Sequence, residues 1–137
     1  MFRGKHSLLT VLISASLLAL LTVQLAAAAL TDKSVESIAL LWFERMRTGQ
    51  IDRTQLTAQY SAQLTDDIVK KMSAYLTEYK YGASPIGAKI LRTRSTGEQT
   101  FYDVKLTFPR GDAASLLFGF NAEGKITGIV LMSMAGD

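Results

Sequence analysis

The spacing of the apolar residues in this chain changes at Pro85, and this change limits the folds open to it. Before Pro85, apolar side chains recur every three or four residues, which is typical of helices with one buried face. After Pro85, runs rich in β-branched and aromatic residues alternate with turn-forming residues, which is typical of strands joined by hairpins. Helices followed by an antiparallel meander predict an α+β domain, with N-terminal helices packed on one face of a curled, antiparallel four-stranded sheet.

Three helices are expected before this break. The first begins at Thr31 or Asp32, which can cap a helix, and ends at Gly49. The second is short and begins at Asp52, where a glutamine three residues later resembles a capping box. The third begins after Thr65. The three apolar stripes are Val35, Ile38, Ala39, Trp42 and Met46, then Leu56, Tyr60 and Leu64, then Ile68, Val69, Met72, Tyr75, Leu76 and Tyr79.

Four strands are expected after the break, at residues 88–95, 100–109, 113–120 and 125–134. Short segments rich in Gly, Asn and Asp separate them, and such residues favour tight turns. The last segment, at residues 121–124, suits a type I turn closed by a left-handed glycine. Each strand is therefore expected to pair with the next one along the chain.

The last turn also predicts which side chains share a face of the sheet. An uninterrupted register from this turn pairs Phe118 with Gly128 and Leu117 with Ile129. Leu117, Ile129 and Leu131 then lie on the face away from the helices, where a wet antiparallel sheet should carry polar side chains. We expect these three residues to form an association patch that binds a second copy of the chain or an envelope protein. Scattered exposed apolar residues are the alternative.

Residues 1–29 have the composition of a signal peptide. Arg3, Lys5 and His6 give this segment a positive start. An apolar run over residues 7–25 follows, and four alanines then supply the small residues that signal peptidases recognise. We therefore expect the protein to be exported, either to the periplasm or by secretion.

Cleavage is expected after Ala29, or after Ala28 as the second choice, which leaves residues 30–137 as one exported domain. The alternative is an uncleaved anchor, because an apolar run of roughly 19 residues is long enough to span a bilayer. The protein is expected at a membrane only if the signal peptide stays uncleaved.

The basic character of the chain comes mainly from this N-terminal segment. The formal net charge is +3, with 15 basic and 12 acidic residues. Without Arg3 and Lys5 the balance is 13 to 12. The remaining close basic residues, at 70–71 and at Arg92 and Arg94, are interpreted as solvated surface. We therefore expect no nucleic-acid partner, because binding needs a basic face that neutralises phosphates.

Cysteine is absent, and His6 is the only histidine. A mature domain without either residue cannot use Ser-His-Asp or Cys-His catalysis or the usual zinc ligands. No Gly-rich phosphate loop or calcium loop is present, so we expect no cofactor and no metal. A carboxylate working with tyrosines, such as Asp103 with Tyr102, is the remaining catalytic option. Strand alternation turns Asp103 away from Tyr102, so we interpret it as a solvated aspartate and name no catalytic residue.

A tryptophan in the first helix, a Pro-Ile-Gly entry to the first strand and an aromatic-rich second strand occur together at residues 42, 85–87 and 101–104. With the Asn-Ala-Glu-Gly-Lys turn at 121–125, this order resembles small exported domains of the nuclear-transport-factor-2-like superfamily, a group of cystatin-like folds. The resemblance implies a cone-shaped domain. Such domains occur alone or beside serine-hydrolase modules of the beta-lactamase-like type, whose Ser-x-x-Lys motif is absent here.

The resemblance also implies a range of activities, since members include isomerases, dehydratases, cyclases and many proteins that only bind. The candidate cavity residues are Trp42, Tyr60, Tyr75, Tyr79 and Tyr102. The core is the alternative place for Trp42, Tyr75 and Tyr79. We expect an exported, non-catalytic domain that binds a small apolar ligand, a peptide or another copy of itself. The alternative is an isomerase-like enzyme that uses a carboxylate and tyrosines on a small apolar substrate.

Overall fold

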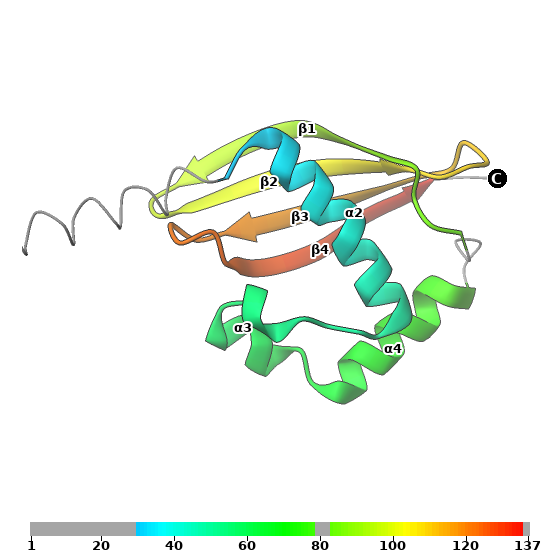
Figure 1. The fold of residues 1–137 in the computed structure, drawn as a ribbon, viewed down its shortest axis with the longest axis horizontal. Helices are drawn as coiled ribbons and strands as arrows, with labels where there is room; N and C mark the ends of the chain where they lie inside the picture. The colour runs from blue at the N-terminus through cyan, green and yellow to red at the C-terminus, as the bar shows by residue number, and fades with distance from the viewer. Residues whose placement is uncertain (1–29, 79–82, 136–137) are drawn as a thin grey trace, which may run out of the picture.

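Helices precede strands in the computed structural model, which describes residues 30–78 and 83–135 (Figure 1). The helices are α2 (Asp32–Thr48), the 3-10 helix η1 (Arg53–Gln55), α3 (Ala58–Gln63) and α4 (Asp66–Glu78). The strands are β1 (Gly87–Thr96), β2 (Gln99–Thr107), β3 (Ala113–Phe120) and β4 (Ile126–Ala135). The strands form one antiparallel sheet in chain order, with β1 and β4 at its edges. This arrangement confirms the predicted α+β class and strand order.

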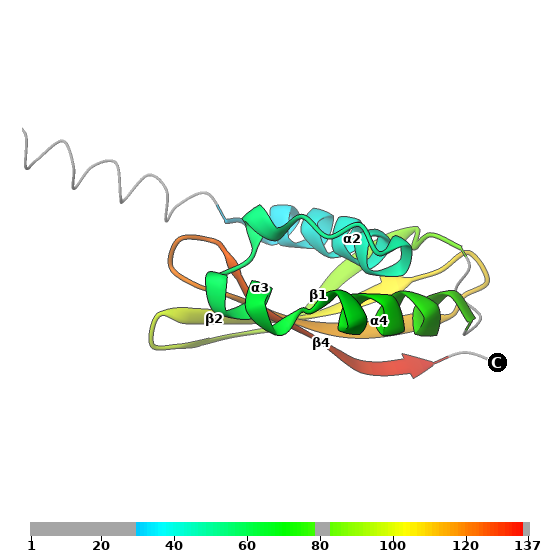
Figure 2. The ribbon, with the colours of Figure 1, turned by 90° about the horizontal axis from the view of Figure 1, so that it is seen from below.

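Among the described helices, α2 alone lies over a face of this sheet, so the expectation that the helices pack on one face is met only by α2. In Figure 1, α2 crosses the sheet, while α3 and α4 lie beyond the β4 edge. Figure 2 shows α2 above the sheet and no described helix on the opposite side. We call the side that bears α2 the helix face and the opposite side the outer face. The expected signal peptide lies outside the described residues, among which no helix has the length and hydropathy needed to cross a membrane.

The first helix, α2, begins and ends where the sequence predicts. The Thr31 side chain accepts a hydrogen bond from the backbone N–H of Ser34 at 3.2 Å, and the Ser34 hydroxyl accepts one from the backbone N–H of Thr31 at 2.9 Å. This reciprocal pair satisfies two N–H groups that a helix leaves open at its start. Gly49 ends the helix with a φ of 76°, a left-handed conformation that glycine adopts without strain.

The core lies between α2 and the helix face of the sheet. Its largest fully buried side chains are Trp42, Phe43, Phe118, Phe120, Leu106, Leu116, Ile126, Val35 and Val104. Phe43 packs edge to face on Phe108, with ring centroids 5.2 Å apart, a favourable geometry for two aromatic rings. The helix α4 adds Val69 and Leu76. No buried residue in the described part of the chain is polar or charged, so apolar burial holds this core together.

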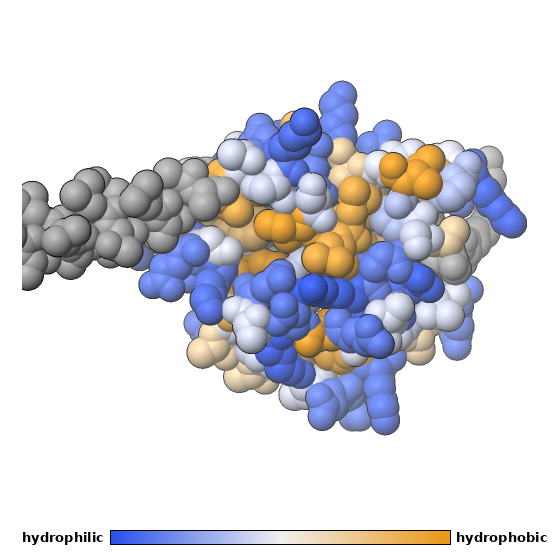
Figure 3. All heavy atoms as spheres, viewed as in Figure 1, coloured by the Kyte–Doolittle hydropathy of each residue, from blue (hydrophilic) through white to orange (hydrophobic). Residues whose placement is uncertain are grey.

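Apolar side chains are also exposed on the helix face. Figure 3 shows them gathered over and beside α2, among hydrophilic side chains. Leu41 of α2 is 46% exposed, and Ile68 and Tyr75 of α4 are 46% and 42% exposed. Exposed apolar residues of this kind are common on folded proteins and do not by themselves indicate a site.

The second expected helix, beginning at Asp52, forms as two short pieces. Between η1 and α3, Leu56 is extended and makes a parallel bridge with Ile126 of β4. The backbone N–H of Thr57 donates to the Ile126 carbonyl at 2.9 Å, and the Thr57 side chain caps α3 by accepting from Tyr60 N–H at 3.2 Å. Pairing with a distant strand therefore interrupts the predicted helix, because it buries Leu56 and gives the backbone N–H of Thr57 a hydrogen-bond acceptor.

A bulge near the start of β4 changes the register predicted for the last hairpin. The turn forms as expected, and Phe120 pairs with Ile126. The next pair joins Gly119 to Gly128, so Thr127 is an extra residue in β4. A Cβ atom at Gly119 would lie 2.5 Å from the Thr127 Oγ1 atom. The bare glycine on β3 therefore makes room for the Thr127 side chain.

This extra residue exchanges the faces of the residues that follow it, because side chains alternate along a strand. Leu117 pairs with Val130 rather than Ile129, and Phe118 pairs with Ile129 rather than Gly128. Ile129 consequently packs against the core on the helix face. The predicted register is wrong from the bulge onwards, and so is the outer-face placement of Ile129.

Leu131 also lies on the helix face, since it pairs with the buried Leu116. A second register shift follows Leu131 and makes Met132 an extra residue. Met132 lines a hollow of the outer face together with Leu117. The outer face therefore carries Leu117, Val130 and Met132 in place of the predicted trio, of which only Leu117 is correctly placed. Val130 is 52% exposed and Met132 is 58% exposed.

Candidate functional site

The aromatic residues expected to line one cavity lie in different parts of the fold. Trp42 is fully buried and Tyr102 is 7% exposed, so both are core residues. Tyr60 lies on α3 beside β4, and Tyr75 lies on α4 with its side chain exposed. Tyr79 falls outside the described residues. The four described side chains therefore do not converge on a common cavity.

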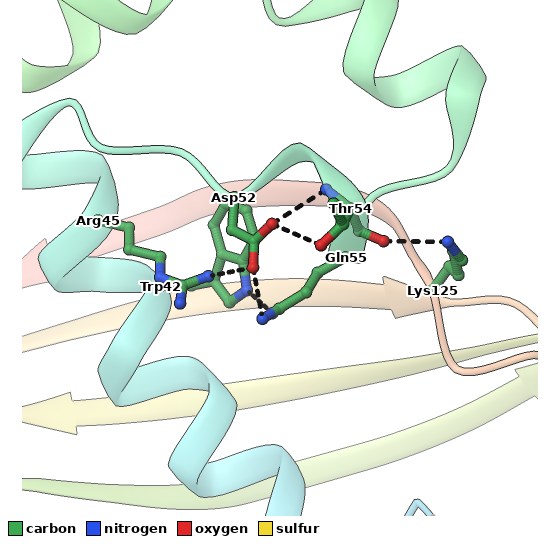
Figure 4. A network of polar contacts seen from close by, with 6 residues as sticks. All are labelled: Trp42, Arg45, Asp52, Thr54, Gln55 and Lys125. Atoms are coloured by element: carbon green, nitrogen blue, oxygen red, sulfur yellow. Dashed lines mark hydrogen bonds and ion pairs between the residues drawn. The ribbon is translucent and has the colours of Figure 1, made fainter.

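Trp42 is held in the core by a network of polar contacts with η1 (Figure 4). Its Nε1 atom donates to Oε1 of Gln55 at 2.9 Å. Nε2 of Gln55 donates in turn to Oδ2 of Asp52 at 3.2 Å, and Nη1 of Arg45 lies 3.4 Å from the same oxygen. The Arg45 guanidinium also lies 5.5 Å from the centre of the Trp42 ring. The network gives the buried indole N–H a partner and fixes η1 against α2.

Asp52 is the charged centre of this network. Its Oδ1 atom accepts from the Thr54 hydroxyl at 2.6 Å and from the Thr54 backbone N–H at 3.1 Å. These two hydrogen bonds, followed by the charge of Arg45, hold the pKa of Asp52 below its ordinary value. Nζ of Lys125 donates to the Thr54 carbonyl at 3.0 Å, which ties the last hairpin to η1. We interpret this network as structural, because its carboxylate is already fully engaged.

Tyr60 covers part of the free edge of β4. Its hydroxyl accepts from the Ile129 backbone N–H at 3.1 Å and donates to the Ile129 carbonyl at 3.4 Å. Burial raises the pKa of this hydroxyl, although the hydrogen bond with Ile129 opposes the shift. Together with the bond from Thr57 to Ile126, this contact places α3 along the edge of β4 as far as Ile129.

A hollow of about 350 Å³ opens on the outer face beside α3, and we call it the glycine hollow. The residues that line it are Thr57, Gln59, Tyr60, Gln63, Gln99, Phe101, Leu117, Gly119, Thr127, Gly128 and Val130. None of these side chains is charged at neutral pH. A Cβ atom at Gly128 would have no neighbour within 4 Å, so the space above this glycine is open. The volume falls within the range of roughly 300–1,000 Å³ that is usual for small-molecule sites.

A second hollow of about 370 Å³ adjoins the first, and we call it the Arg-Asp hollow. The residues that line it are Arg92, Thr93, Arg94, Phe101, Asp103, Leu117 and Met132. Phe101 and Leu117 belong to both hollows, so the two form a continuous depression across the outer face. Arg92 and Arg94, interpreted from the sequence as plain solvated surface, lie at its rim.

Asp103 differs from the solvated aspartate that the sequence suggests. Its side chain is 20% exposed, and Oδ2 lies 3.8 Å from Nη2 of Arg92. The Oδ1 atom is buried and has no hydrogen-bond partner among the described residues. Asp103 lines the outer face, whereas Tyr102 is buried on the helix face, where burial and then the charge of Asp32 raise its pKa. The carboxylate and the tyrosine hydroxyl therefore do not face a common substrate space.

The site thus combines an uncharged, glycine-floored hollow with a charged rim further along the sheet. No group of three acidic residues that could hold a metal ion occurs among residues 30–78 and 83–135. Sequence reasoning missed Phe101, Val130 and Met132 as outer-face residues. The useful signal was the pair of glycines inside the two last strands, because glycine within a strand often marks a bulge or a close backbone approach.

No protein-family model matches this chain, and neither a curated protein nor a solved structure matches it. The fold and the site define a small α+β domain whose sheet has one covered face and one hollowed, partly apolar face.

Proposed function

We propose that this protein is an exported, non-catalytic binding domain that holds a small, uncharged, apolar ligand on the outer face of its sheet. The proposal of export depends on residues 1–29, whose positive start, apolar run and terminal alanines are typical of a signal peptide. We also propose a cystatin-like cone of the nuclear-transport-factor-2-like kind. The order of helices and strands and the sequence resemblance support that assignment.

The observation that carries the binding proposal is the lining of the glycine hollow. Phe101, Leu117 and Val130 supply its apolar surface, and Gly128 leaves room above the sheet, since a Cβ atom there would meet nothing within 4 Å. Glutamine amides from α3 and β2 stand at its rim and offer hydrogen bonds to a polar group of the ligand. An apolar ligand gains about 25 cal/mol for each Å² of apolar surface removed from water, whereas a charged ligand would lose its hydration without gaining a partner.

A non-catalytic role is supported by the placement of the polar groups. Residues 30–137 contain neither histidine nor cysteine. The core on the helix face has no buried polar side chain among the described residues, and Asp103 lies on the other side of the sheet from Tyr102. The isomerase-like alternative needs a carboxylate and a free tyrosine hydroxyl in one cavity, whereas Asp103 and Tyr60 line different, adjoining hollows and the Tyr60 hydroxyl is hydrogen-bonded to the backbone of Ile129.

Gly128→Val tests the binding proposal directly. The new side chain would enter the open space of the glycine hollow, and the φ of Gly128 is not among the positive values that disfavour other residues. The fold should therefore survive, because valine suits a strand. We expect the fluorescence enhancement of N-phenyl-1-naphthylamine, an uncharged apolar probe, to be lost in this variant.

Ser133→Val is the matched control, since it adds a β-branched side chain to the same strand outside the glycine hollow. This variant should bind the probe like the wild type. Equal probe binding by Gly128→Val, with the fold intact, would show that the glycine hollow is not the binding site.

Association through the outer face, with another copy or an envelope protein, is a second candidate function. The exposed side chains of Val130 and Met132, next to Leu117, favour it. Leu117→Lys changes this face on the interior strand β3 and is the variant that would remove such a partner.

A further inference from the structure

The charged residues of the four strands all lie on one half of the outer face. Strands β1 and β2 place four basic side chains there, and Asp103 is the one acidic side chain among them. The basic residues are Lys89, Arg92, Arg94 and Lys105. Strands β3 and β4 carry no charged residue. The half of the outer face made by β1 and β2, which we call the basic half, therefore has an excess of positive charge.

This excess does not reflect the charge of the rest of the molecule. Residues 30–78, which include the described helices, carry seven acidic and six basic residues. The positive charge of the sheet thus lies on the face opposite α2, while the helical part is close to neutral. A negatively charged surface would therefore attract the protein with its outer face foremost.

Two lysines of the basic half face each other without a counter-charge, and we call them the lysine pair. Lys89 pairs with Lys105 across β1 and β2, and both residues are exposed. No described residue forms an ion pair with either of them. Like charges directly opposite each other destabilise a sheet, so an anion bound at the lysine pair would relieve this repulsion. The same row across the sheet continues with Ser115 and Ser133, whose hydroxyls can donate to the oxygen atoms of an anion.

The basic residues are spread too widely to share one small anion. Lys89 and Arg94 are both on β1, and an extended strand places them roughly 15 Å apart. Arg92 lies between them with 85% of its side chain exposed, and its nearest approach to Asp103 is 3.8 Å. A surface that carries many negative groups, such as the head groups of an anionic bilayer, can contact all of these residues at once.

The other half of the outer face supplies exposed apolar side chains beside the basic ones. Val130 is 52% exposed and Met132 is 58% exposed, and Leu117 lies next to them. A nucleic acid would neutralise the basic half but would leave these side chains in water. Binding to a bilayer surface combines electrostatic attraction to head groups with burial of apolar side chains at the boundary of the acyl chains. The two halves of the outer face therefore match an anionic bilayer better than they match a polyanion.

We propose that the outer face docks on the surface of a bilayer that contains anionic lipids. The basic half contacts the head groups, and Val130 and Met132 enter the boundary with the acyl chains. Figure 2 shows no described helix on this side of the sheet, so a planar surface can approach it. Docking gives residues 30–137 a route to a membrane that needs no uncleaved signal peptide. It goes beyond the proposed ligand binding and does not depend on it.

Charge reversal of the lysine pair tests the docking. Lys89→Glu/Lys105→Glu keeps two like charges opposite each other, so its stability should match that of the wild type. Lys70→Glu/Lys71→Glu is the matched control, because it makes the same change in net charge at exposed positions of α4. Protein from the exported fraction is sedimented with vesicles of phosphatidylcholine alone, or of phosphatidylcholine mixed with phosphatidylglycerol.

The wild type and the control should bind the mixed vesicles much more tightly than the neutral ones. The reversal variant should bind the mixed vesicles at least about 25-fold less tightly, since each lysine near an anionic surface strengthens binding about five-fold. Lys89→Gln/Lys105→Gln, which also removes the repulsion between the two lysines, should lose binding in the same direction. The fluorescence of N-phenyl-1-naphthylamine, measured without vesicles, should be the same in the reversal variant as in the wild type, so docking and ligand binding can fail separately.

Three results would overturn the proposal. The first is a wild type that binds both kinds of vesicle equally, or neither. The second is an equal loss of binding in the Lys70→Glu/Lys71→Glu control, which would make net charge and not the outer face responsible. The third is a wild type that binds polyglutamate or a DNA oligonucleotide but not the mixed vesicles, which would assign the basic half to an acidic protein or to a nucleic acid.

Discussion

Alanine substitutions at Gly119 and Gly128 should change stability in opposite directions, although the two glycines face each other across β3 and β4. At Gly119 the new Cβ would lie 2.5 Å from the Thr127 Oγ1 atom and 3.0 Å from a carbon of the Phe101 ring. At Gly128 the same atom meets nothing within 4 Å. One methyl group is therefore added to a crowded site in the first variant and to open space in the second.

The expected magnitudes follow from these contacts. Replacing glycine by alanine without strain stabilises a protein by about 0.4–1 kcal/mol, because the unfolded chain loses freedom. Overpacking a filled site costs about 1–3 kcal/mol. Gly128→Ala should therefore raise the free energy of unfolding by about 0.5 kcal/mol. Gly119→Ala should lower it by about 0.5–2.5 kcal/mol after the same gain is allowed for.

Urea unfolding followed by circular dichroism measures both changes, with an unchanged dependence on urea as the sign that only stability has altered. Thr127→Ala removes the nearest clashing atom, so the double variant Gly119→Ala/Thr127→Ala should recover part of the lost free energy. The size of this recovery separates the crowding by Thr127 from that by Phe101.

Two results would refute this reasoning. Equal effects of the alanines at Gly119 and Gly128 would mean that the two sites have the same room, which the bulge at Thr127 does not allow. Additive effects of Gly119→Ala and Thr127→Ala would mean that the two side chains do not touch, and the register between β3 and β4 would then have to differ from the one described.

Two further predictions concern acid stability and processing. The pKa of Asp52 is lowered by folding, so its contribution to stability is complete above the unfolded value of 3.8 and is lost as the pH falls through the lower folded value. Urea unfolding from about pH 5 to about pH 2 should therefore show a smaller loss of stability in Asp52→Asn than in the wild type, and an identical loss would contradict the role of the carboxylate. Intact-mass measurement of exported protein should give a chain that begins at Leu30, or at Ala29 for the second cleavage site, whereas a membrane fraction that retains residues 1–29 would indicate an anchor.

The parts of the fold that depend on local chemistry were predictable from the sequence. The capping by Thr31, the glycine stop at Gly49 and the turn at residues 121–124 each involve residues a few positions apart. Their hydrogen bonds form within the segment itself, so the residue types in that segment are sufficient to indicate them.

The parts that depend on distant residues were not predictable in this way. Leu56 has a helical pattern around it, but pairing with Ile126 on β4 makes it extended. The bulge at Thr127 depends on the space above Gly119 on the neighbouring strand. Because the side chains of a strand alternate, this single extra residue was enough to misplace most of the predicted association patch.

The same distinction between local and distant interactions applies to the candidate site. Strand alternation along β2 correctly predicted that Asp103 faces away from Tyr102, because it depends on adjacent residues only. The burial of the Asp103 carboxylate arises from its neighbours on other strands, which are Arg92 on β1 and Leu117 on β3. A sequence pattern along β2 contains no information on these neighbours, so the hollow they form became visible only in the folded structure.

The contact between Tyr60 and Ile129 has a consequence for how the protein folds. A helix of six residues such as α3 is not stable alone in water, so it depends on its contacts with β4 and on the hydrogen bonds that Arg53 donates to Ser61 and Leu64. Segments held by so few contacts open at a lower free energy than the whole domain. Each opening of α3 uncovers the edge of β4 between Ile126 and Ile129, where Thr57 and Tyr60 otherwise form hydrogen bonds. During folding, the edge of β4 stays uncovered until α3 docks on it. The time at which α3 docks therefore determines how long newly made chains can aggregate through this edge.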